Sequence, residues 1–151
     1  MTAHRALIPL SLVTLAAALS GCGGSSSSGA SKAAFIKRAD TICLRASKAQ
    51  DALTQPASNA QRAAYVKRVY AIERGVVADL RGLQPPSSDR ATVNDMLDSV
   101  DRALAFESDV EAAAMGGDQS AINSAEAKGA RDLNHATTVA KRYGFKECGN
   151  T

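Results

Sequence analysis

Beyond the first thirty positions, the spacing of the apolar residues limits the folds that this chain can adopt. In four successive segments, apolar side chains recur mostly at steps of three and four residues, which is typical of one face of an α-helix. Proline or glycine separates each segment from the next. No segment shows the strict alternation of apolar and polar residues that is typical of a half-buried β-strand. The sequence therefore predicts an all-α domain.

The four segments are residues 31–53, 59–84, 87–116 and 118–143. The residues that separate them are, in chain order, Pro56, Pro85 with Pro86, and Gly116 with Gly117. Their apolar stripes are Phe35, Ala39, Ile42, Ala46, Ala49 and Leu53; Tyr65, Val69, Ile72, Val76, Leu80 and Leu83; Val93, Met96, Leu97, Val100, Leu104, Val110 and Ala114; and Ile122, Ala125, Gly129, Leu133, Ala136, Ala140 and Tyr143. Helices of similar length with short connections favour an up-down-up-down four-helix bundle.

Charge is sorted among the segments in a way that supports this order. The third segment is strongly acidic, whereas the second is basic and the fourth mildly so. In an up-down-up-down bundle the third helix lies between the second and the fourth, so opposite charges meet. Exposed ion pairs contribute only about 0–1 kcal/mol each, so this sorting favours the arrangement more than it stabilises the fold. The alternative interpretation is an acidic strip that recruits a cationic partner.

The first 21 residues are organised like an export signal. Arg5 precedes a run over residues 6–19 in which Pro9 and two hydroxyl residues interrupt apolar and small side chains. A helix that spans a bilayer needs roughly 20 apolar residues, and this run is shorter and ends in small rather than basic residues. The sequence therefore predicts a signal peptide over residues 1–21 rather than a lasting transmembrane span.

This signal ends in Leu19, Ser20, Gly21 and Cys22, which resemble the lipobox of bacterial lipoproteins. The resemblance implies that diacylglycerol is attached to the Cys22 sulfur and that the chain is cleaved before Cys22. Two acyl chains anchor a protein where one binds only marginally, so we expect a location on the extracytoplasmic face of the cell membrane. Residues 22–30 are then the lipidated cysteine and a Gly/Ser tether with a reach of about 15 Å. The alternative is an ordinary secreted protein in which Cys22 is a free thiol.

The chain has three cysteines, an awkward number for an exported protein. With Cys22 lipidated, Cys43 and Cys148 remain as a pair in a compartment that permits disulfides. A bridge between them closes a long loop, and in the chain-entropy treatment it stabilises the folded state by roughly 4.7 kcal/mol. Cys43 lies about 18 Å into the first helix, so we expect Gly144 to end the last helix and residues 145–148 to run back along the first, with Phe145 packed down. Two inert buried thiols are the alternative.

Short motifs extend the resemblance over the mature domain, residues 31–151. They are, in chain order, ADTIC, LRGLQPP, GGD and YGFKECG. Their spacing is similar to that of small helical lipoproteins common in alanine-rich actinobacterial proteomes, a family without an assigned activity. The resemblance implies a helical fold with a paired cysteine and a location in the cell envelope, and it implies no chemistry.

Three of the glutamates fall on the predicted apolar stripes. Glu107 and Glu111 lie near the middle of the third stripe, and Glu73 lies within the second. Because buried carboxylates without partners are costly, we expect them to pair with basic residues or to reach solvent at the edge of a stripe. The expected partners are Arg45, Arg131 and Lys128.

The alternative for these glutamates is a dinuclear metal–carboxylate site, which uses Glu-x-x-His motifs on two helices of a bundle. This chain has no such motif, and in the nearest match, Asp132 to His135, the imidazole points away from the predicted core. His135 also has no serine and acid arranged around it for nucleophilic catalysis. We therefore expect no metal, no cofactor and no enzymatic activity.

The net charge of the chain argues against one further class of function, binding to nucleic acid. The net charge of +3 falls by one when Arg5 leaves with the signal peptide, which is too small to indicate binding to nucleic acid. The sequence favours a tethered module that binds an envelope protein or a small ligand. A metal-dependent or hydrolytic envelope enzyme and a structural envelope protein are the alternatives.

Overall fold

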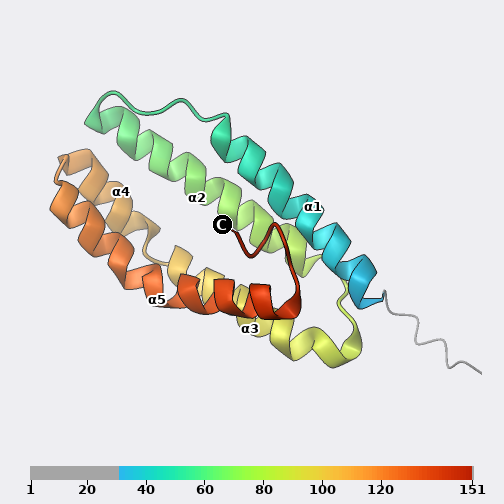
Figure 1. The fold of residues 1–151 in the computed structure, drawn as a ribbon. Helices are drawn as coiled ribbons and strands as arrows, with labels where there is room; N and C mark the ends of the chain where they lie inside the picture. Colours follow the sequence, from blue (N-terminus) through green and yellow to red (C-terminus); the bar gives the residue numbers. More distant parts are fainter. Residues whose placement is uncertain (1–30, 151) are drawn as a thin grey trace, which may run out of the picture.

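The computed structural model of the chain describes residues 31–150, which form a helical bundle (Figure 1). Its helices are, in chain order, α1 (Lys32–Asp51), α2 (Asn59–Arg81), the short 3₁₀-helix η1 (Ser87–Asp89), α3 (Arg90–Leu104), α4 (Glu107–Gly116) and α5 (Gln119–Tyr143). No β-strand occurs among these residues. The predicted all-α, up-down-up-down bundle is confirmed, with α3 and α4 together forming its third leg (Figure 1).

Capping residues set the ends of several helices. Ser31, Ser58 and Asp118 accept hydrogen bonds through their side chains from backbone N–H groups in the first turns of α1, α2 and α5. Gly117 and Gly144 follow α4 and α5 with φ angles of 72° and 106°, the left-handed region that glycine adopts without strain. The helices therefore end where turn-forming residues interrupt the apolar pattern.

The third leg differs from the single helix that its stripe predicts. The predicted segment begins at residue 87, but the first three residues form the 3₁₀-helix η1, and α3 begins only at Arg90. The helix then breaks at Ala105 and Phe106: the Ala105 N–H is shared between the carbonyls of Asp101 and Arg102, and the Phe106 N–H donates to the carbonyl of Ala103, three residues back. The break lets α4 pack against α2 and the first half of α5.

This break divides the buried side chains into two clusters. The larger cluster joins α1, α2, α3, α5 and the C-terminal segment: Phe35, Ala39, Cys43, Leu80, Val93, Met96, Leu97, Ala136, Ala140, Tyr143 and Phe145. The smaller cluster joins α2, α4 and α5: Ala63, Val110, Ala114, Ile122 and Ala125. Each cluster contains three alanines, so small side chains contribute to both.

Ion pairs link the acidic third leg to its neighbours. Arg81 on α2 contacts Asp98 and Asp101 on α3 at 2.7 and 2.6 Å. Lys128 on α5 contacts Asp109 on α4 at 2.6 Å. The third leg thus lies between the second and the fourth, as the charge sorting predicts.

The C-terminal segment, residues 145–150, crosses from the end of α5 to α1 (Figure 1). At Gly144 the chain turns, and the Phe145 N–H donates to the carbonyl of Ala140 at 3.1 Å, closing a Schellman motif. The Phe145 ring is buried, with its centroid 6.0 Å from that of Phe35 and 4.9 Å from that of Tyr143. The predicted return path along the first helix is confirmed.

A disulfide between Cys43 and Cys148 ties this segment to α1, with Cα atoms 5.2 Å apart. The predicted pairing is therefore confirmed. Since α1 packs mainly against α2, and α5 against α3 and α4, the C-terminal segment and its disulfide close the bundle between the first and last helices.

Candidate functional site

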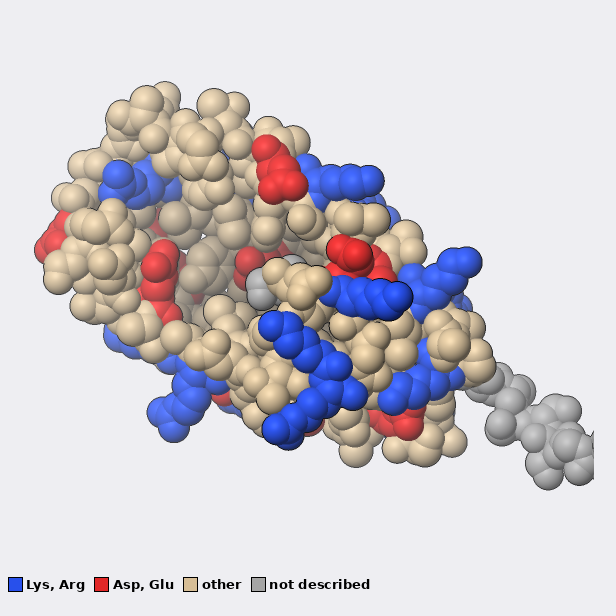
Figure 2. All heavy atoms as spheres, viewed as in Figure 1, with Lys and Arg blue, Asp and Glu red and all other residues tan. Residues whose placement is uncertain are grey.

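A cavity of about 180 Å³ lies between α1, α2, α3 and α5, beside the C-terminal segment. Figure 2 shows the surface hollowed in this region, between the α1–α2 side and the α5 side. Its lining consists of Cys43, Ala46, Ser47, Gln50, Glu73, Val76, Val77, Leu80, Met96, Leu97, Val100, Leu133, Ala136, Thr137, Ala140 and Cys148. Apolar side chains predominate, as they do in small-molecule sites.

Small side chains on two facing helices create this space. α1 contributes Ala46 and Ser47, and α5 contributes Ala136, Thr137 and Ala140. Side chains of this size leave the region between the helices unfilled. The larger buried apolar residues of α2 and α3 line the cavity opposite them.

Leu133 on α5 lies on the predicted apolar stripe, yet its side chain is 44% exposed. It belongs to the cavity lining, so its exposure places it where the cavity opens to solvent. Contact between water and an apolar side chain is unfavourable, so covering this side chain with an apolar group is favourable.

Glu73 on α2 carries the carboxylate of this cavity. The Gln50 side-chain N–H₂ on α1 donates to Glu73 Oε1 at 3.3 Å. Burial raises the pKa of Glu73 above its ordinary value of 4.5, and the hydrogen bond from Gln50 acts in the opposite direction. Among residues 31–150 Glu73 forms no ion pair, so neither Arg45, Arg131 nor Lys128 is its partner.

The other two predicted carboxylates lie outside the cavity lining. Glu107 on α4 forms an ion pair with Arg74 on α2, and its side chain is only 12% exposed. Glu111, one turn further on, is half-buried. Two of the basic residues expected as partners have other carboxylates: Arg45 pairs with Asp79, and Lys128 with Asp109.

These carboxylates do not assemble into a metal-binding group. Within the described part of the chain, no set of three or more His, Cys, Asp and Glu side chains is placed to hold a metal ion. Asp132 instead accepts from Arg102 at 2.9 Å, and His135 Nε2 lies 2.8 Å from a carboxylate oxygen of Asp95. Both pairs link α3 to α5.

Tyr70, one turn before Glu73 on α2, is a residue that the sequence reasoning did not single out as chemically unusual. Burial raises its pKa first, and the carboxylates of Glu73, Glu126 and Glu107 raise it further. Negative charges on α2, α4 and α5 therefore all disfavour ionisation of this phenol. The i, i+3 spacing of Tyr70 and Glu73 was the available signal.

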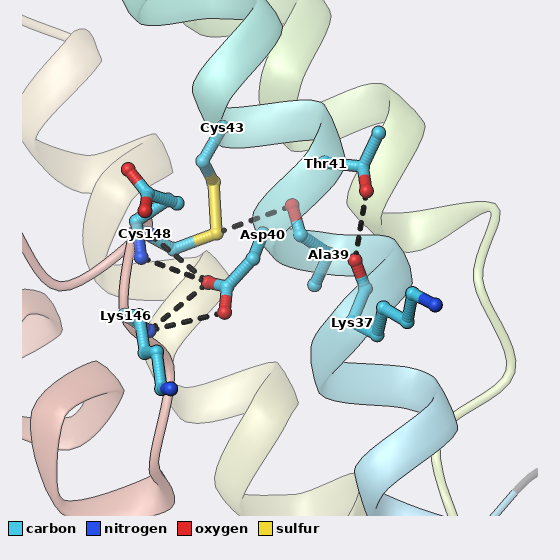
Figure 3. The surroundings of a disulfide bond; sticks show 8 residues. Lys37, Ala39, Asp40, Thr41, Cys43, Lys146 and Cys148 are labelled. Carbon is cyan, nitrogen blue, oxygen red and sulfur yellow. Dashed lines mark hydrogen bonds between the residues drawn. A yellow bond between two sulfur atoms is a disulfide. The ribbon is translucent and has the colours of Figure 1, made fainter.

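One wall of the cavity is held by the disulfide and by Asp40 (Figure 3). The Asp40 carboxylate on α1 accepts backbone N–H groups of Lys146 at 3.1 Å, Glu147 at 3.0 Å and Cys148 at 3.4 Å. Asp40 lies within the ADTIC motif, one turn before Cys43. A side chain of α1 therefore orients the segment that the disulfide attaches.

The predicted signal peptide, the lipidation site Cys22 and the tether lie outside the described residues. No helix within residues 31–150 combines the length and the apolar character that crossing a membrane requires. The chain matches no protein-family model, and no curated protein or solved structure matches it either.

Proposed function

We propose that this protein is a binding module whose cavity between α1 and α5 takes up a small apolar group, and that a lipid on Cys22 tethers the module to the outer face of the membrane. The cavity itself is the observation that carries the first part. Its volume of about 180 Å³ is close to that of an engineered apolar cavity of about 150 Å³ that takes up benzene. One aromatic ring or a short alkyl chain therefore fits.

The architecture around the cavity favours binding because its walls are fixed before a ligand arrives. The Cys43–Cys148 disulfide and the Asp40 hydrogen bonds hold the C-terminal segment against α1. On the opposite side α5 packs along α3 and α4. A preformed site loses little conformational entropy when a ligand enters, so more of the contact energy contributes to affinity.

Binding of 2-phenylethanol tests this proposal, with the dissociation constant measured from NMR chemical shifts. We expect a value on the order of 1 mM, as suits a ligand of this size. Ala46→Phe places a ring in the cavity and should abolish binding. Ala49→Phe makes the same change at an exposed position of α1 outside the lining and should leave binding intact. Equal binding by both variants, or none by the wild type, would contradict the proposal.

The membrane tether rests on the lipobox-like sequence Leu19 to Cys22 and on the Gly/Ser run that follows it. Such a tether leaves the domain mobile near the lipid surface. Cells fed a clickable fatty acid should label the wild-type protein, and Cys22→Ser should lose both the label and membrane association. Continued labelling of the Cys22→Ser variant would contradict a lipid at this position.

A further inference from the structure

The described side chains that line the cavity can supply a negative charge but no positive charge. Within the described part of the chain, its lining contains one ionisable side chain, Glu73. The cysteines of the lining are joined to each other in the disulfide. Its remaining polar residues are neutral: Ser47, Gln50 and Thr137. The site therefore offers a ligand one carboxylate, neutral polar groups and apolar contacts.

Two arginines on the helices that line the cavity are engaged by other carboxylates. Arg74, the residue after Glu73, pairs with Glu107 on α4. Arg45, on the α1 side of the cavity, pairs with Asp79. Glu73 is left with a neutral amide donor from Gln50 at 3.3 Å, a long hydrogen bond. Its carboxylate thus retains acceptor capacity for a stronger donor.

We infer that the ligand of this cavity is a small organic amine, whose ammonium group pairs with the Glu73 carboxylate while its apolar body fills the space between α1 and α5. This inference rests on the proposed function. Hydrogen bonds from an ammonium group to a carboxylate are shorter and stronger than those between neutral groups. An anionic ligand would instead place two negative charges together in a poorly solvated site.

The solvation of Glu73 supports the same assignment. Because burial raises its pKa, the carboxylate is disfavoured in the empty cavity. A bound cation offsets part of the free-energy cost of burying the ionised carboxylate. The limited volume, about 180 Å³, favours a free amine with one ring or a short alkyl chain over a larger partner.

Three probes that share a ring and a two-carbon spacer test the inference: 2-phenylethylamine, 2-phenylethanol and 3-phenylpropionate. Their head groups at pH 7 are an ammonium, a hydroxyl and a carboxylate. The amine should bind about tenfold more tightly than the alcohol, and the carboxylate more weakly than either. If the alcohol binds and the amine binds no better, the inference fails while the proposed function stands. If none of the probes binds, the proposed function itself fails.

Glu73→Gln keeps the size of the side chain and removes its charge. It should weaken amine binding about tenfold and leave alcohol binding unchanged. Glu73→Asp keeps the charge and should retain a preference for the amine over the alcohol. Glu111→Gln, the same change at a half-buried position outside the lining, should retain the full preference. An amine preference that persists in Glu73→Gln would overturn the assignment, because the cation would then bind elsewhere.

Discussion

Gly129 on α5 lies so close to Ala103 on α3 that a Cβ atom on Gly129 would stand 3.1 Å from the Ala103 carbonyl oxygen and 3.3 Å from its Cα. Both contacts are with backbone, which cannot rotate away as a long side chain can. The third and fourth legs of the bundle therefore pack through main chain at this level. Gly75 on α2, by contrast, has nothing within 4 Å of the corresponding position.

Gly129→Ala should therefore destabilise the fold, and Gly75→Ala should stabilise it. Replacing glycine by alanine in an open helix position contributes about 0.5–1 kcal/mol. At Gly129 the overpacking cost of about 1–3 kcal/mol exceeds this gain. Urea unfolding of both variants measures whether each change lowers or raises the free energy of unfolding. A stabilised Gly129→Ala protein would show that α3 and α5 are further apart than described.

Asp40→Ala should loosen the C-terminal segment while the disulfide remains intact. The change removes the acceptor of the N–H groups of Lys146 and Glu147, which are otherwise exposed. By analogy with the loss of a helix N-cap, we expect a fall in the free energy of unfolding of about 0.5–2 kcal/mol. Hydrogen exchange at these two amides should accelerate, and less so in Asp40→Asn, whose side-chain oxygen still accepts.

Asp51→Ala, an exposed aspartate at the end of the same helix, is the matched control and should leave exchange at Lys146 unchanged. If Asp40→Ala also leaves it unchanged, the disulfide and Phe145 alone hold the segment in place.

Glu73→Gln should make the protein more stable at pH 7. The pKa of Glu73 is raised by burial, so the folded state holds its proton more tightly than the unfolded chain does. The stability that this group contributes is present below its ordinary pKa of 4.5 and is lost as pH rises through the folded value. Glutamine does not ionise, so the advantage of the variant should narrow as pH falls toward 4.5.

Other groups near Glu73 do not obscure this comparison. Glu107 is paired with Arg74, Gln50 is neutral, and burial raises the pKa of Tyr70 further above its ordinary value of 10.0. Unfolding free energies at pH 7 and pH 4.5 for the wild type, Glu73→Gln and Glu111→Gln give the required differences. A Glu73→Gln protein that is less stable at pH 7 would show that the ionised carboxylate stabilises the fold.

The sequence predicted much of this architecture because its signals are local. Proline and glycine mark the ends of the segments, and the three-and-four spacing marks the buried faces. The pairing of Cys43 with Cys148 followed from the cysteine count once Cys22 was assigned to the lipid. The burial of Phe145 followed from the position of Cys43 in the first helix and the cap at Gly144.

The break in the third leg was missed because neither Ala105 nor Phe106 is a helix breaker. A signal was present, however. The predicted stripe steps by six residues from Leu104 to Val110, an interval that does not return a side chain to the same face of a helix. The break restores Val110 to a buried position in the second cluster.

The site could not be predicted in full, because it depends on contacts between helices, and the spacing of residues along one helix does not give those contacts. The stripe placed Glu73 toward the interior, but its partner, Gln50, comes from the neighbouring helix. Arg74 was not among the expected partners of Glu107, although it pairs with it across α2 and α4. Likewise, the cavity exists because small side chains on α1 and α5 face each other, which no single helix reveals.

Intermolecular NOEs in methyl-labelled protein test the claim that a ring enters the cavity between α1 and α5. With 2-phenylethylamine bound, the ring protons should give NOEs to the methyl groups of Val76, Val100 and Leu133, which line the cavity. They should give none to Val110 and Ile122, which belong to the second buried cluster. Ring NOEs confined to methyl groups outside the lining, or none at saturating probe, would contradict the claim.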